Sequence, residues 1–111
     1  NLAIHEFAHK IDMRNGAANG CPPLPAEMPP HVWKRTMTAA YEHFQARVAR
    51  GERTAIDPYA AESPAEFFAV LSEVFFVEPR LLRHEYLAVY QQFARFYRQE
   101  PAARAELLMD A

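Results

Sequence analysis

The apolar residues of this chain recur at the spacing typical of helices. In residues 1 to 14 they follow the pattern i, i+3, i+4 and i+7, which places on one side of a helix Ile4, Phe7, Ala8 and Ile11. We expect this stripe to be buried and Asn15-Gly16 to end the helix. A second amphipathic helix is predicted for residues 31 to 50, with Gly51 at its end.

A third helix is predicted to begin at Ser63. This residue has the character of an N-cap, with Pro64 at the first helical position and Glu66 at the third. Residues 67 to 77 are apolar except at two positions, so we expect this helix to run through the middle of the domain.

The rest of the chain follows the same helical pattern. Beyond Pro79 a fourth helical segment is predicted, ended by Pro101, and residues 102 to 109 are predicted to add a short helix. Residues 15 to 30 contain five prolines and two glycines, which excludes a regular helix or a central strand there. No stretch alternates apolar and polar residues well enough to predict a strand, so the expected fold class is all-α.

The composition limits what kind of protein this is. The chain has 111 residues, so we expect residues 1–111 to form a single helical unit. A net charge of -2 gives no basic surface for nucleic acid, and no apolar run is long enough to span a membrane. The single cysteine excludes an internal disulfide and favours a reducing, cytoplasmic location.

The first predicted helix contains the motif HExxH, at His5-Glu6-Phe7-Ala8-His9. Residues four apart lie on one face of a helix, so His5 and His9 can both bind one zinc ion, with Glu6 beside them as a general base. This pattern indicates a zinc-dependent hydrolase. The alternative is a chance pentad in a helical domain that binds no metal.

A catalytic zinc needs a third protein ligand. The remaining histidines have no second metal-like spacing, and more favourable candidates are the carboxylates on or beside the third helix: Glu62, Glu66 and Glu73. Glu66 has an equally good alternative role, because in Ser63-x-x-Glu66 its carboxylate can cap the backbone N–H of Ser63. Glu73 is either an acceptor that orients a ligand histidine or a paired buried acid.

Four stretches of the sequence, in order, closely resemble the bacterial Mlc titration factor A family of zinc peptidases: HEFAHKIDM, NGCPPLP, IDPYAAESPAEFFAVLSEVFF and QQFARFYRQEP. The family is similar to the catalytic domain of anthrax lethal factor in having a glutamate third ligand preceded seven residues earlier by a tyrosine. The resemblance implies the helical part of a gluzincin-like domain. It also implies zinc bound by His5, His9 and Glu66, with Glu6 as the catalytic acid and base and Tyr59 stabilising the transition state. Without that role, Tyr59 would be a core aromatic with its hydroxyl at the surface.

The same resemblance implies two kinds of partner, a peptide or protein substrate and the glucose-responsive transcriptional repressor Mlc. The second would make the protein a regulator that sequesters a repressor independently of catalysis, through a surface such as the loop of residues 19 to 30.

Two further expectations concern the surroundings of the zinc site. Thermolysin-type enzymes have an aspartate four residues after the ligand glutamate, but here that position is Val70. We therefore expect Asp12 to support a ligand histidine, unless it is an acid on the helix surface. Family members also have a sizeable portion ahead of HExxH, so this chain is expected to be a fragment that lacks an upstream subdomain, and to self-associate through an exposed stripe of Ile4, Phe7 and Ile11.

Overall fold

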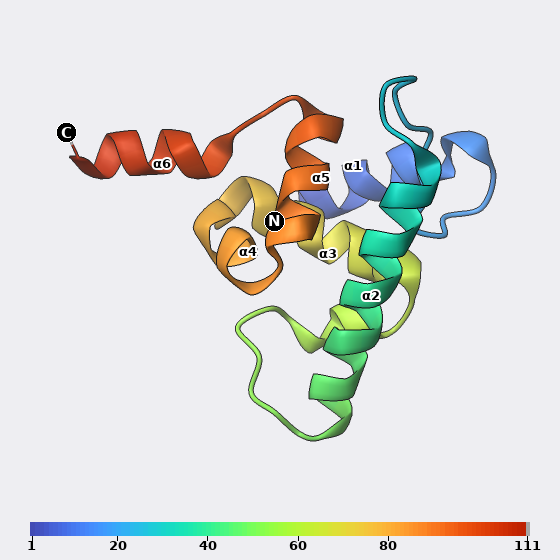
Figure 1. Ribbon diagram of the computed structural model, residues 1–111. Coiled ribbons are helices and arrows are strands. Elements are labelled where there is room, and N and C mark those ends of the chain that lie inside the picture. The colour runs from blue at the N-terminus through green and yellow to red at the C-terminus, as the bar shows by residue number, and fades with distance from the viewer. Residues whose placement is uncertain (111) are drawn as a thin grey trace.

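The computed structural model describes residues 1–110 and is made of helices joined by loops (Figure 1). The elements are α1 (Leu2–Asp12), the 3-10 turn η1 (Met13–Asn15), α2 (Pro30–Ala49), the 3-10 turn η2 (Pro58–Ala61), α3 (Pro64–Val77), α4 (Pro79–Glu85), α5 (Leu87–Tyr97) and α6 (Pro101–Asp110). These residues include no strand, which confirms the all-α prediction. None of the described helices is both long enough and apolar enough to cross a membrane.

Helix α3 lies in the middle of the fold, between α1, α2, α4 and α5 (Figure 1). It begins as predicted, because the Ser63 hydroxyl accepts a hydrogen bond from the backbone N–H of Glu66 and Pro64 occupies the first helical position. Half of its residues are buried: Phe67, Phe68, Ala69, Val70, Leu71, Ser72 and Phe75. The predicted central helix is therefore confirmed.

Aromatic side chains from three helices form the centre of the core. The Trp33 ring of α2 stacks on Phe93 of α5 at a centroid distance of 5.6 Å, and both rings meet Phe68 of α3 edge to face. Each of these side chains is almost completely buried. Because burying a large aromatic side chain contributes roughly 2 to 3 kcal/mol, this cluster holds α2 and α5 against the central helix.

The fourth predicted segment is two helices rather than one. Helix α4 ends at Glu85 and α5 begins at Leu87, with extended backbone at Tyr86 (φ -142°, ψ 75°). The Tyr86 ring is buried, and its hydroxyl meets His43 Nδ1 at 3.0 Å and a guanidinium nitrogen of Arg47 at 3.4 Å. The apolar spacing continues through Tyr86, which is why one helix was predicted, but contacts of Tyr86 with α2 accompany a bend in the chain at this residue.

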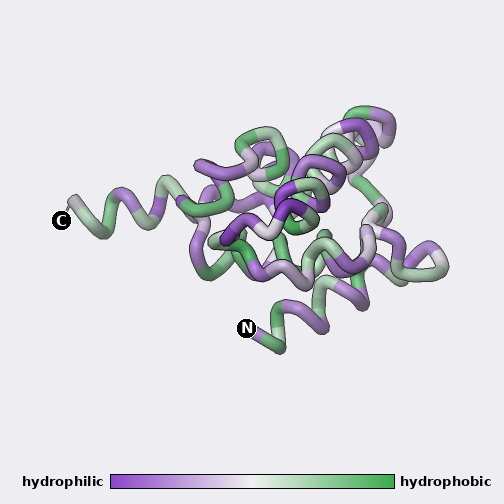
Figure 2. Tube along the Cα trace, turned by 90° about the horizontal axis from the view of Figure 1, so that it is seen from below, coloured by the Kyte–Doolittle hydropathy of each residue, from purple (hydrophilic) through white to green (hydrophobic). Residues whose placement is uncertain are grey.

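The predicted buried stripe of α1 is only partly buried. Ala8 is buried, Ile4 and Ile11 are half-buried, and Phe7 is 59% exposed. Helix α1 runs along an edge of the molecule (Figure 2), and it contacts α3 mainly through the side that includes Ala8 and Asp12. Because α3 covers the side of α1 that includes Ala8 and Asp12, Phe7 lies outside the contact. The expectation that Phe7 is buried was wrong, and the expectation that it is exposed agrees with the structure.

Candidate metal centre

Helix α1 presents both histidines of the HExxH motif toward α3. The helix is capped by Asn1, whose side-chain oxygen accepts hydrogen bonds from the N–H groups of Ala3 and Ile4. The one-turn spacing of His5 and His9 brings their Nε2 atoms to 3.1 Å from each other. Their side chains are 14% and 21% exposed, so the pair lies at the rim of the core, open to solvent on one side.

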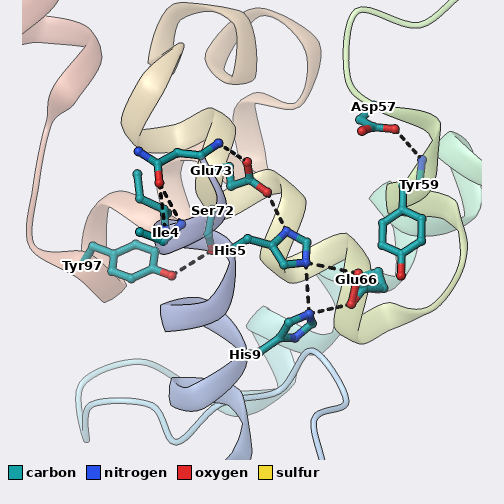
Figure 3. A network of polar contacts seen from close by, with 11 residues as sticks. Ile4, His5, His9, Asp57, Tyr59, Glu66, Ser72, Glu73 and Tyr97 are labelled. Carbon is teal, nitrogen blue, oxygen red and sulfur yellow. Dashed lines mark hydrogen bonds and ion pairs between the residues drawn. The ribbon is translucent and has the colours of Figure 1, made fainter.

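The carboxylate of Glu66 faces the two imidazoles (Figure 3). Its Oε2 lies 3.2 Å from His5 Nε2, and its Oε1 lies 2.5 Å from His9 Nε2. The capping box is therefore half formed, since the Ser63 hydroxyl caps the Glu66 N–H while the Glu66 carboxylate turns to the histidines. The alternative role of Glu66, in which its carboxylate caps the Ser63 N–H, does not agree with the position of this carboxylate.

These three side chains have the geometry of a metal-binding cluster. One donor atom from each of His5, His9 and Glu66 lies within 4.8 Å of the other two. Tetrahedral zinc with bonds of about 2.0 to 2.1 Å holds its ligand atoms about 3.3 Å apart. Two of the separations are close to that value and the third is shorter. Two imidazole nitrogens, one carboxylate oxygen and an open side suit a zinc ion with a free coordination position.

Glu73 supports His5 from behind. Its Oε1 lies 2.6 Å from His5 Nδ1 (Figure 3). Burial tends to raise the pKa of Glu73, but the hydrogen bond with His5 is among the contacts that hold that pKa below its ordinary value. An ionised acceptor at Nδ1 keeps the proton there, and this leaves the Nε2 lone pair of His5 free for a metal.

The position of Glu73 explains why Val70 is tolerated four residues after Glu66. Val70 is buried, whereas Glu73 lies two helical turns beyond Glu66, on the same face of α3. That seven-residue spacing is the sequence signal that could have selected Glu73. Asp12, which we expected to support a histidine, is fully buried and instead accepts a hydrogen bond from the N–H of Gly20 at 2.7 Å.

Tyr59 lies beside the cluster and not in the core. Its backbone N–H is capped by Asp57 in η2, and its side chain is 51% exposed. In Figure 3 its hydroxyl points toward Glu66, whose negative charge raises the pKa of this hydroxyl. Like any tyrosine hydroxyl at neutral pH, it is protonated and can donate a hydrogen bond. Glu6 is exposed on α1 next to His5.

A cleft of about 260 Å³ opens beside His5. Its lining comes from α1, from η2 and the segment before it, and from α3 and the residue after it: His5, Ala55, Asp57, Tyr59, Val70, Glu73, Val74 and Glu78. Of the three cluster residues, only His5 lines this cleft.

The structure does not bring the other candidate residues to this cluster. His43 contacts the Tyr86 hydroxyl, and His31 and His84 are exposed. Glu62 is exposed next to η2. Burial raises the pKa of the Cys21 thiol above its ordinary value, which disfavours the reactive thiolate.

Comparison with known proteins places this arrangement in a family. The model of the glucose-regulated metallo-peptidase M90 family matches residues 1–98. Mlc titration factor A of Yersinia pestis (strain Pestoides F) is 50% identical over 107 residues, which cover 94% of this chain and 39% of that protein. The protein of the same name from Yersinia pseudotuberculosis serotype O:1b gives the same values. The chain thus spans about two fifths of the length of these relatives. The resemblance found in the sequence is confirmed, and the chain belongs to the glucose-regulated metallo-peptidase M90 family.

Proposed function

We propose that this chain carries the metal centre of a zinc-dependent peptidase, with His5, His9 and Glu66 as the metal ligands. The observation that carries the proposal is the convergence of their three donor atoms on one point between α1 and α3. Family membership supports a metallopeptidase. The donor set of two imidazoles and a carboxylate favours zinc over magnesium or calcium, which prefer oxygen ligands only.

The side chains around the ligands have the chemistry for peptide hydrolysis. Bound zinc would supply Lewis-acid chemistry, polarising a carbonyl and making water easier to deprotonate. Glu6 would accept the proton from the water that attacks the peptide carbonyl and then return it to the leaving amine. Tyr59, held neutral beside Glu66, would donate a hydrogen bond to the oxygen on which negative charge develops.

Two substitutions separate metal binding from catalysis. His9→Ala removes a ligand, so elemental analysis should show about one zinc per chain in the wild type and a loss of zinc in the variant. Glu6→Gln keeps the shape of the side chain and all three ligands, so zinc content should stay unchanged while peptide hydrolysis is abolished. Glu42→Gln, an exposed change of the same kind on α2, serves as the control. Hydrolysis at the wild-type rate in Glu6→Gln would rule out the proposed base.

A regulatory role is the second candidate, and the name of the relatives favours it. They are called Mlc titration factor A, which describes titration of Mlc. Such a role needs a binding surface and not turnover. Treatment with a chelator distinguishes the two functions: if peptidase activity is lost while binding of the repressor persists, the two sites are separate. If both disappear together, the metal centre also maintains the binding surface.

A further inference from the structure

Asp12 is a buried acidic residue that does not belong to the metal cluster. It is the last residue of α1, three residues after His9, and its side chain has no exposed surface. One carboxylate oxygen accepts the N–H of Gly20, and the other is buried without a hydrogen-bond partner in residues 1–110. Burying a carboxylate with one oxygen unpaired is unfavourable. A contribution to folding stability alone therefore does not explain why an acidic residue occupies this position.

Gly20, the partner of Asp12, is enclosed on three sides. Its backbone has φ +81°, a conformation that side chains other than hydrogen rarely allow. An added Cβ would lie 2.7 Å from the carbonyl oxygen of Pro64, closer than real Cβ atoms come. The Gly20 carbonyl also accepts a hydrogen bond from the Trp33 indole at 3.0 Å. Only glycine fits between these neighbours.

Two of the neighbours of Gly20 are close in sequence to the proposed ligands. Asp12 follows His9 by one turn of α1, and Pro64 precedes Glu66 by two residues in the first turn of α3. Gly20 therefore lies between the helix that carries the histidine pair and the turn that carries the carboxylate. The loop of residues 13–29 that contains it runs past the N-terminal end of α2 (Figure 1).

We propose that Asp12 and Gly20 form a positioning unit that sets the separation of His9 from Glu66, and through it the metal affinity of the site. This inference rests on the proposed function. In this unit the buried carboxylate holds the loop against the end of α1, and the missing side chain at position 20 lets α3 begin close enough for Glu66 to reach both imidazoles.

A pair of glycine substitutions tests the unit. Gly51 has nearly the same backbone (φ +75°), but an added Cβ there meets nothing within 4 Å. Gly20→Ala and Gly51→Ala thus introduce similar backbone strain, and only the first pushes on Pro64. We expect Gly20→Ala to weaken zinc binding by about tenfold or more, the size seen when residues that orient metal ligands are changed. It should also alter the visible spectrum of the cobalt-substituted protein, and Gly51→Ala should change neither.

A second pair keeps the test decisive if Gly20→Ala does not fold. Asp12→Asn retains an oxygen that can accept a hydrogen bond from the Gly20 N–H, so this variant should keep the wild-type zinc affinity and cobalt spectrum. Asp12→Ala has no such oxygen and should bind zinc about tenfold more weakly. Equal zinc affinity and equal spectra across all four variants would overturn the proposal, as would Asp12→Asn and Asp12→Ala behaving alike.

The metal-free protein separates this inference from the proposed function. If the wild type takes up no zinc, the proposed function fails, but the ring ¹⁵N signals of His5 and His9 still report how α1 lies against α3. Movement of these signals in Gly20→Ala and not in Gly51→Ala would support the positioning unit. Unchanged signals in both variants would overturn it.

Discussion

Replacing Glu73 by glutamine should weaken zinc binding without removing any ligand. The Glu73 carboxylate lies 2.6 Å from His5 Nδ1. A hydrogen bond to a charged acceptor contributes about 1.5 to 3 kcal/mol, and one to a neutral acceptor about 0.5 to 1.5 kcal/mol. Glutamine keeps the acceptor and loses the charge, so the variant should lose roughly 1 to 2 kcal/mol of zinc affinity. That loss corresponds to a dissociation constant about 5 to 30 times higher.

The control for this substitution is Glu78→Gln. Glu78 lines the same cleft beside His5, but it is exposed and forms no hydrogen bond with a histidine in the described part of the chain. Glu78→Gln also removes one negative charge from the cleft, but solvent screens the effect of this charge on the metal ligands. We expect its zinc affinity to stay within about twofold of the wild type.

The assay is competition for zinc between the protein and a chromophoric chelator at fixed pH and ionic strength, with circular dichroism to show that each variant is folded. If Glu73→Gln and Glu78→Gln weaken zinc binding equally, the effect is that of general charge in the cleft, and the argument from the hydrogen bond to His5 is refuted. An unchanged affinity in Glu73→Gln refutes it as well.

Three further predictions concern residues outside the ligand set. Tyr59→Phe should lower kcat by about 100-fold with little change in KM or zinc content, because it removes the hydrogen-bond donor to the developing negative charge. Peptidase kinetics together with zinc analysis check this. An unchanged kcat would show that Tyr59 has only a structural role. Burial raises the pKa of Tyr97 to about 12, although its hydrogen bond with Ser72 lowers it. The folded pKa lies above the unfolded value of 10.0. The contribution of the neutral Tyr97 hydroxyl to the free energy of unfolding is therefore complete below pH 10 and is lost as the pH rises toward 12, a loss on the order of 2 to 3 kcal/mol. Urea unfolding across this range should show a steeper decline in stability for the wild type than for Tyr97→Phe. Phe7→Gln should reduce self-association measured by light scattering, because Phe7 is the most exposed residue of its stripe; if Leu108→Gln on α6 disperses the chain instead, the contact is elsewhere.

The sequence by itself determined the helical fold and placed two of the three proposed metal ligands on one helix face. Helix periodicity, the Ser63-Pro64 start and the proline and glycine stops are local signals, and each acts within a few residues of where it stands. The one-turn spacing of His5 and His9 is equally local, because any helix places them on one face. These features do not depend on contacts between residues that are far apart in the chain.

Tertiary structure decided where Glu66, Glu73 and Asp12 point. The string Ser63-x-x-Glu66 suits a cap and a ligand alike, and only the approach of α1 to α3 turns its carboxylate to the histidines. The same approach brings Glu73 to His5 and leaves Asp12 to the loop. The sequence also did not predict the bend at Tyr86, and it left open whether Phe7 is buried or exposed, because each depends on which helix covers which face. Such contacts join residues far apart in the chain, and local spacing carries no information about them.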